Sequence, residues 1–389
     1  MQPTSSKIWS RDFVLLFLSD LLVWISFYFL LPTLPIYISQ HLGGSPTQVG
    51  MIFNGLTITA IVARLLSGFA LERWGRRPVY CVSLAVFAAI AFSYHWAASL
   101  WLLALIRLAH GIPFGSASTT NNTVAADLTP PLRRGEAMGS FAMASTMAMA
   151  VGPALALYIV SERQFSRLFT LCGLLALAAL LLALAVRYPL VRNAQARFSL
   201  AGLFERRVGW LAVATTLAMF GYGGIVTFIT VYAVQYGIRQ PGMFFTVLAL
   251  GLAVSRVVGG RIFDHMGPRV PILAGLGTMV VALLLLGLSP SPSGFLAAAA
   301  FFGLGLGAIT SSVLAMAVNA VPAERRGASN ATVMSAMDLG IGGGASILGM
   351  VAQATASYAA MFLVAAGVLV VPLALFMVKV LPGYGGRDS

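Results

Sequence analysis

Apolar residues form twelve long stretches along this chain of 389 residues, and short polar turns separate them. The stretches span 13–38, 46–71, 78–96, 98–124, 137–160, 167–187, 208–236, 242–263, 269–289, 293–318, 329–353 and 357–380. Each is long enough to cross a bilayer, because a transmembrane helix needs about 20 mainly apolar residues. The first stretch is too long for a signal peptide and no small-residue cleavage site follows it, so we expect it to remain as a span. The pattern therefore predicts an all-α membrane protein with twelve transmembrane helices.

Polar and glycine residues in the turns recur at a fixed offset of 192 positions. Arg64, Gly68, Glu72 and Gly75 recur as Arg256, Gly260, Asp264 and Gly267, and the run Arg133-Arg134-Gly135 recurs as Arg325-Arg326-Gly327. The offset is close to half of the chain, so one half duplicates the other, as in two-bundle membrane transporters. We expect two pseudo-symmetric six-helix bundles, 1–190 and 206–389. A cytoplasmic linker, 191–205, would join them within the long polar interruption at the middle of the chain.

Composition and charge agree with a membrane protein. Only 9% of the residues are charged and 59% are hydrophobic, which excludes a soluble protein of this length. The net charge of +13 does not indicate a nucleic-acid partner, because the basic residues are placed asymmetrically. With both termini in the cytoplasm, 20 of the 24 Lys and Arg residues fall on cytoplasmic turns or ends, all except Arg107, Arg163, Arg167 and Arg239. This bias is the positive-inside rule, and it predicts a multi-pass protein of the plasma (inner) membrane with both termini inside.

The turn after the second stretch carries a family resemblance. The run from Gly68 to Arg77, GFALERWGRR, resembles the loop 2–3 signature of the major facilitator superfamily, and the run from Gly260 to Arg269 resembles its second-half copy. The resemblance implies the twelve-helix fold of that superfamily and a gating role for Arg64, Gly68, Glu72, Gly75, Arg76, Arg256, Gly260, Asp264 and Gly267. It implies that Glu72 faces the amino end of helix 11 and that Asp264 faces that of helix 5, where a carboxylate is stabilised by the helix dipole. The alternative is that these charges only anchor the topology.

Two further motifs are similar to those of drug:proton antiporters in the same superfamily. Arg107-Leu108-Ala109-His110-Gly111 resembles an Arg-x-x-x-Gly motif tied to proton coupling, and Gly152-Pro153 resembles part of the antiporter signature of helix 5. An arginine in a membrane is costly unless it is paired or hydrated, so Arg107 should face the interior of the bundle. The alternatives are a structural tie for Arg107 and a simple proline kink with small-residue packing at Gly152 and Pro153.

Proton coupling requires a group that gains and loses charge inside the membrane. Of the eleven carboxylates, only Asp20 and Asp338 lie within spans, and both are candidate proton carriers because burial disfavours the charged form. Asp20, Trp24 and Tyr28 follow at intervals of four, so they share one stripe of helix 1. We expect His110 to bridge Asp20 and Arg107 through water. The alternatives are that Asp20 reaches cytoplasmic water, that Asp338 makes a helix–helix hydrogen bond, and that His110 is a packed polar residue.

The remaining cavity candidates are aromatic, methionine and asparagine residues within spans. An aromatic and methionine lining with few charges suits amphipathic or weakly cationic organic substrates. With the stripe of helix 1, the expected lining is Trp24, Tyr28, Asn54, Phe114, Met143, Met147, Tyr222 and Phe228. Each of these residues alone is also compatible with ordinary packing.

Other energy sources and chemistries leave no trace in the sequence. There is no Walker phosphate loop, no metal-binding spacing among the His and Cys residues, and Cys81 and Cys172 lie inside spans as packing residues. We therefore expect no enzymatic activity, no cofactor and no metal. The predicted function is a monomeric, proton-coupled exporter of small amphipathic molecules that works by alternating access. A dedicated exporter of a metabolite such as a sugar or metallophore, a proton-coupled uptake symporter, and a transport-inactive sensor remain as alternatives.

Overall fold

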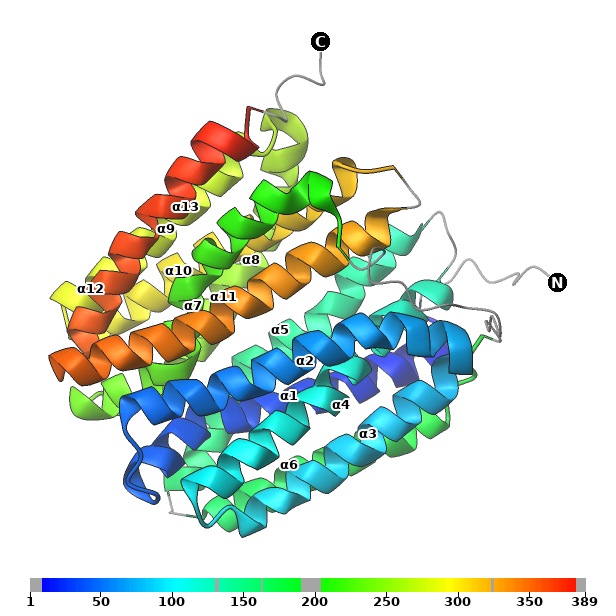
Figure 1. The fold of residues 1–389 in the computed structure, drawn as a ribbon, viewed down its shortest axis with the longest axis horizontal. Helices are drawn as coiled ribbons and strands as arrows, with labels where there is room; N and C mark the ends of the chain where they lie inside the picture. The colour runs from blue at the N-terminus through cyan, green and yellow to red at the C-terminus, as the bar shows by residue number, and fades with distance from the viewer. Residues whose placement is uncertain (1–8, 130–132, 162–163, 190–203, 323–324, 383–389) are drawn as a thin grey trace. The chain divides into compact units, whose positions relative to one another are not determined.

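The computed structural model describes residues 9–129, 133–161, 164–189, 204–322 and 325–382, which form helices and turns with no β-strand among them (Figure 1). In the first half of the chain the helices are α1 (Arg11–Gln40), α2 (Pro46–Trp74), α3 (Arg76–Ser93), η1 (Tyr94–Trp96), α4 (Leu100–Asp127), α5 (Arg134–Ser161) and α6 (Phe165–Leu184). In the second half they are η4 (Arg206–Val208), α7 (Gly209–Gln235), α8 (Gly242–Met266), α9 (Arg269–Leu288), α10 (Pro292–Asn319), α11 (Arg326–Thr355), α12 (Tyr358–Val368), α13 (Val370–Leu375) and η6 (Phe376–Val380). The all-α fold predicted from the sequence is confirmed.

Eleven helices of the described residues are long and apolar enough to cross a membrane. The remaining predicted span, 242–263, corresponds to α8, whose apolar segment within the described residues is Gly242–Arg256. The last span, predicted as one helix, is divided among α12, α13 and the π-helical turn η6. Pro372 lies within α13 and has no backbone N–H for the helical ladder, which accounts for an interruption near this position.

Residues at helix ends, like those in the turns, correspond between the two halves at the offset of 192 positions. Ser99 caps α4 by accepting a hydrogen bond from the Leu102 backbone N–H, and Ser291 caps α10 in the same way through Gly294. Gly75 and Gly267 both adopt positive φ, 87° and 72°, which is the backbone conformation that ends α2 and α8. The two halves therefore begin and end corresponding helices with the same local chemistry.

Close helix packing is duplicated at the same offset. A Cβ on Gly115 of α4 would overlap the Ala60 carbonyl of α2, and a Cβ on Gly307 of α10 would overlap the Leu252 carbonyl of α8. Likewise, Gly152 of α5 lies against Tyr28 of α1, as Gly344 of α11 lies against Phe220 of α7. Small residues allow these helix backbones to approach closely, which is how membrane helices gain packing energy without a hydrophobic driving force.

The helices group into two compact units. The first unit contains residues 1–30 and 58–198, and the second contains 31–57 and 199–389. Residues 31–57, around the turn between α1 and α2, join the second unit through direct contacts with α7 and α11. The Thr230 hydroxyl of α7 donates a hydrogen bond of 2.9 Å to the Pro32 carbonyl of α1.

A line of small residues joins α2 to α11 within the second unit. We call it the α2–α11 seam, and it consists of Pro46, Gly50, Asn54 and Thr57 facing Gly342, Ala345, Ser346 and Gly349. A Cβ on Gly50 would overlap the Ala345 carbonyl, and the Ser346 hydroxyl donates to the Gly50 carbonyl at 3.4 Å. The backbones of the two helices are thus in direct contact along the seam.

Aromatic side chains mark both ends of the helices. Trp96, Trp101 and Tyr158 are 69%, 84% and 71% exposed, and they lie at the end of the first unit opposite to the arginine-rich turns. Trp74 is 60% exposed beside the turn between α2 and α3. Exposed aromatic residues at helix ends are typical of the two membrane–water interfaces.

Candidate functional site

Asp20 lies inside the first unit, about a third of the way along α1, and is only 6% exposed. Its carboxyl group accepts hydrogen bonds from the side chains of Asn121 in α4 and Trp24, one turn further along α1. A carboxyl group buried in an apolar bundle is costly unless polar partners hold it. Asn121 is itself 1% exposed, so the pair forms a polar contact shielded from solvent.

The residue before Asp20 fixes the position of α1. The Ser19 hydroxyl donates to the Ala179 carbonyl of α6 at 2.9 Å and is 3.0 Å from the Tyr80 hydroxyl of α3. Two turns further, the Ser26 hydroxyl donates to the Cys172 carbonyl of α6 at 3.0 Å. These bonds between helices hold the Asp20 face of α1 in one orientation. Cys172 is buried and unpaired, in agreement with the packing role expected for it.

Four aromatic rings continue the stripe beyond Asp20. Trp24 stacks on Tyr28 with ring centroids 5.8 Å apart and meets Phe114 of α4 edge-on at 5.3 Å. Phe27 stacks on Phe114 at 4.4 Å with only 9° between the ring planes. Trp24, Tyr28 and Phe114, predicted as cavity residues, therefore form one aromatic cluster with Phe27 next to the buried acid. A ring face of this kind attracts organic cations and apolar groups.

Arg107 and His110 form a second polar cluster in the same unit. Arg107 is 1% exposed and hydrogen-bonds the side chain of Tyr94, which follows α3 in η1. The Tyr94 hydroxyl lies 3.0 Å from His110 Nδ1, and the His110 ring packs against Phe87 at 4.4 Å. His110 Nε2 is buried and has no hydrogen-bond partner among the described residues. The contacts thus join His110 to Arg107 through Tyr94, whereas the sequence led us to expect a bridge through water toward Asp20.

The second unit holds the other acid within a span. Asp338 is half-buried on α11, two residues from Ala336, whose carbonyl accepts a bond of 3.0 Å from Thr216 of α7. Tyr222 of α7 stacks on Phe302 of α10 with centroids 6.0 Å apart. Phe228 is fully buried and packs against Tyr358 of α12, so the structure places it in the core of this unit.

The other predicted cavity and antiporter residues lie on three helices. Met143 and Met147 of α5 are 55% and 47% exposed, and they follow the helix toward Gly152 and Pro153. Pro153 lies within the continuous helix α5, one residue after the close contact between Gly152 and Tyr28. Asn54 faces Gly342 in the α2–α11 seam of the second unit.

The arginine-rich turn between α2 and α3 is fixed by an ion pair. Arg76 Nε donates to Asp127 Oδ2 at the end of α4 at 3.0 Å, and its Nη1 donates to the Leu71 carbonyl at 3.1 Å. Both partners are largely shielded, with side chains 10% and 23% exposed. Glu72, in contrast, is exposed, and a Cβ built on Gly68 would meet only open space.

The remaining gating residues are described in part. Arg64 of α2 and Arg256 of α8 are both half-buried, and each has polar or electrostatic partners. In the second copy of the motif, Gly267 keeps the positive φ of Gly75. The side-chain surroundings of Gly260 and Asp264 lie outside the part of the structure that is described. The expected contacts of Glu72 and Asp264 with helix amino ends therefore stay predictions.

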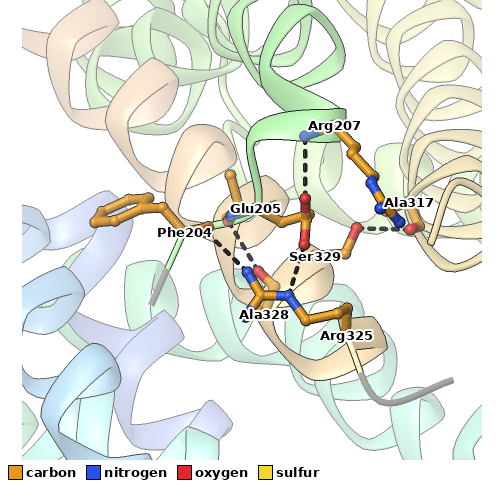
Figure 2. A network of polar contacts seen from close by, with 8 residues as sticks. Phe204, Glu205, Arg207, Ala317, Arg325, Ala328 and Ser329 are labelled. Atoms are coloured by element: carbon orange, nitrogen blue, oxygen red, sulfur yellow. Dashed lines mark hydrogen bonds and ion pairs between the residues drawn. The ribbon is translucent and has the colours of Figure 1, made fainter. Parts of the chain in front are cut away.

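A polar network ties the start of α7 to the start of α11 in the second unit (Figure 2). Arg325 Nε donates to Glu205 Oε2 at 2.8 Å, and the Arg207 backbone N–H donates to Glu205 Oε1 at 3.1 Å. The Glu205 backbone N–H donates to the Thr332 hydroxyl at 2.9 Å. The Glu205 side chain is 7% exposed, so these bonds are shielded from water. The hydrogen bond from Arg325, followed by that from Arg207, lowers the pKa of the Glu205 carboxyl below its ordinary value of 4.5.

This network gives a stability prediction. A carboxyl group whose pKa is lowered by folding stabilises the protein above its unfolded pKa, and the stabilisation is lost as pH falls through the lower, folded pKa. Glu205→Gln should therefore lower the melting temperature in detergent at pH 7, and the difference from the wild type should shrink as the pH falls below 4.5 and disappear below the lowered, folded pKa. The effects of Glu205→Gln and Arg325→Gln should not add in the double variant. Additive effects, or a difference that persists in acid, would exclude the ion pair as the cause.

Sequence reasoning missed the partners of the charged residues. Asp127 pairs with Arg76, Tyr94 links Arg107 to His110, and Glu205 pairs with Arg325. Each of these contacts joins different structural elements. The available signal was weak. Asp127 and Glu205 were recognisable as carboxylates at helix ends near arginine-rich turns, but spacing along the chain does not pair them. Among the described residues, no group of three His, Cys, Asp or Glu side chains could hold a metal ion.

Comparisons with known proteins agree on one family. The sequence profile of the Major Facilitator Superfamily matches residues 16–286 and 238–388. The chain is 27% identical over 345 residues to a multi-drug resistance efflux pump PmrA homolog of Lactococcus lactis, covering 83% of this chain and 84% of that protein. It is 21% identical over 337 residues to an uncharacterized MFS-type transporter of Methanocaldococcus jannaschii, covering 84% and 87% of the two chains.

A solved structure shows the same fold. The crystal structure of the nucleoside transporter NupG superposes with a TM-score of 0.77 at 16% identity, covering 95% of this chain and 98% of that one. The profile spans both of the duplicated halves, and eleven helices of the described residues have the length and apolar composition of membrane spans. The chain belongs to the Major Facilitator Superfamily of membrane transporters.

Proposed function

We propose that this protein is a proton-coupled exporter of small amphipathic organic molecules, and that Asp20 carries the proton. The observation that supports this proposal best is the site around Asp20. A carboxyl group that is 6% exposed is held by Asn121 and Trp24 beside four aromatic rings. The Asp20 carboxyl group can bind a proton or, when charged, attract an organic cation, so proton and cation compete for it.

Competition at one carboxyl group yields exchange. When Asp20 is protonated the site is neutral, and a cationic or amphipathic substrate keeps only its contacts with the aromatic rings, so it binds more weakly and is released more readily. When the proton leaves, the carboxylate again attracts substrate. One proton moving down a gradient of 100 mV supplies about 2.3 kcal/mol, enough for a substrate ratio of about fifty. Arg107 adds a fixed, buried positive charge to the same bundle, and we propose that it keeps proton and substrate binding coupled.

The α2–α11 seam is the contact that we propose to open and close during alternating access. With the arginine-rich turns assigned to the cytoplasm by the positive-inside rule, the seam lies on the outer side of the membrane. We propose that its glycine contacts close this side and part when substrate is released outward. The hydrogen bond from Ser346 to Gly50 is 3.4 Å long and therefore weak, so this contact can form and separate at modest cost.

Similarity to a multi-drug resistance efflux pump homolog supports export of organic compounds, at 27% identity. The test is a substrate screen in inside-out membrane vesicles that contain a pH-sensitive dye. An exported substrate should collapse an interior-acid gradient when it is added outside, and only in vesicles that contain the protein. Compounds that instead enter right-side-out vesicles together with protons would identify an uptake symporter. Response to one metabolite and to no other amphipathic compound would identify a dedicated exporter.

A further inference from the structure

A cavity lies at the arginine-rich end of the first unit, away from Asp20. It opens between the start of α3 and the end of α6, two helices that pack side by side (Figure 1). Its volume is about 700 Å³. The lining consists of two segments, Trp74–Pro78 and Leu184–Pro189.

Two arginines give the cavity its charge. Arg76 is already paired with Asp127, and Asp12 accepts the backbone N–H of Arg187 at 3.0 Å. The guanidinium groups of Arg77 and Arg187 are exposed and make no ion pair with any described residue. Two arginines on opposite walls of one cavity are suited to a phosphate group, because a guanidinium offers paired N–H donors to its oxygens.

The wall formed by the end of α6 is held in place. Val186 is 4% exposed, and the Tyr188 hydroxyl donates to the Ala183 carbonyl at 2.8 Å. The Tyr188 ring meets Tyr80 of α3 at 6.5 Å, and Arg77 lies close enough for its charge to act on Tyr188. The cavity is therefore a formed site between two helices, with Arg77 close to Tyr188.

The rim of the cavity is apolar. Trp74 and Leu184 are 60% and 44% exposed, and they lie at the ends of helices that reach the membrane–water interface. A soluble phosphate compound would leave these apolar side chains exposed to water, whereas a lipid would cover them with its acyl chains. Basic pockets between membrane helices on the cytoplasmic side are suited to anionic lipid headgroups.

We propose that this cavity binds the phosphate headgroup of an anionic membrane lipid, with Arg77 and Arg187 contacting the phosphate and Trp74 and Leu184 contacting the chains. The inference uses the cytoplasmic assignment of the arginine-rich turns but is independent of the transported substrate. It gives the first unit a lipid contact on the turn that carries the gating motif.

The duplicated half provides a matched control. At the offset of 192 residues, Arg77 corresponds to Arg269 and Arg187 to Lys379, but Arg76 corresponds to Pro268 and Trp74 to Met266. Lys379 lies over the Trp210 ring at 5.9 Å, so its charge is already engaged. Removing Arg269 and Lys379 therefore changes the net charge equally, at corresponding positions, without touching the cavity.

The experiment measures lipid binding by native mass spectrometry of the purified full chain in detergent. Phosphatidylglycerol should bind more tightly than phosphatidylcholine, and Arg77→Gln/Arg187→Gln should weaken it about thirtyfold. Arg269→Gln/Lys379→Gln should leave binding unchanged, and Arg77→Lys/Arg187→Lys should keep part of it because the charges remain. Monodisperse elution of each variant checks that it is folded.

Three results would overturn the proposal. Equal losses in the cavity variant and the matched control would show that bulk charge attracts the lipid. Equal binding of phosphatidylcholine would show that the anionic headgroup is not recognised. Displacement of phosphatidylglycerol by millimolar glycerol phosphate would assign the site to a soluble phosphate compound and not to a lipid.

Discussion

Asp20→Asn is expected to abolish substrate accumulation driven by a proton gradient. Asparagine keeps the size of the side chain and its hydrogen-bonding capacity toward Trp24 and Asn121, but it cannot release or bind a proton in the physiological range. In inside-out vesicles with a gradient of 100 mV, accumulation should fall from a ratio of up to about fifty to a ratio of one. Filtration of vesicles loaded with a labelled substrate measures this ratio.

Two variants separate loss of coupling from loss of folding. At a raised substrate concentration, Asp20→Asn should still exchange labelled for unlabelled substrate across the membrane, because the aromatic rings still bind substrate weakly and exchange requires no net proton movement. Asp338→Asn removes the other carboxyl group within a described span and should retain the proton-driven accumulation. If Asp20→Asn accumulates substrate like the wild type, or if Asp338→Asn alone abolishes accumulation, Asp20 is not the proton carrier.

Gly50→Ala is expected to hold the α2–α11 seam apart and to stop the transport cycle. A Cβ at this position would overlap the carbonyl and backbone of Ala345, and neither helix has a flexible side chain there to yield. Overpacking of this kind costs about 1–3 kcal/mol, so the population with a closed seam should fall by a factor of about 5 to 150. Transport should fall accordingly.

Seam closure is measurable by cysteine labelling. Thr57 faces Gly342 in the seam, so Thr57→Cys, in a chain with Cys81 and Cys172 replaced by alanine, reports on access from the outer side. A membrane-impermeant maleimide should label this cysteine faster when Gly50→Ala is present. Gly343→Ala is the matched control, because Gly343 neighbours Gly342 but has open space where the Cβ would be placed. Equal labelling rates in both variants would exclude the seam as a gate.

Much of the fold could be predicted because its signals are local. A run of about 20 apolar residues defines a membrane helix without reference to any other part of the chain. The first span was predicted over 13–38 and the helix is Arg11–Gln40, while the last span is divided near Pro372 into shorter helices. The offset of 192 residues can also be read from the sequence without knowing any contact, and the paired contacts of Gly115 and Gly307 follow it.

The partners within the site could not be predicted in the same way. Asn121 lies about a hundred residues from Asp20, and no spacing rule along the chain joins α1 to α4 at that depth. His110 was expected near Asp20 from its depth along α4, but rotation about the helix axis directs it to Tyr94. Depth can be estimated from residue count, whereas the direction of a side chain depends on how the helices pack.

The α2–α11 seam illustrates a second limit. Gly50 and Gly342 are ordinary small residues in the sequence, among 40 glycines, and their importance depends on which backbone lies opposite. The contact joins residues of the first sequence half to the second unit, so a division of the chain at its middle did not indicate it. Contacts that form and break between helices leave little periodic signal in either helix.

Coupled exchange at Asp20 is tested most directly by following protons and substrate together in proteoliposomes of the purified protein. A trapped pH-sensitive dye reports proton movement while filtration reports a labelled substrate identified in the vesicle screen. Our account predicts that substrate moving in one direction drives protons in the other, and that Asp20→Asn ends the proton movement while substrate exchange continues. Substrate movement at the same rate with no accompanying proton flux, in the wild type, would contradict it.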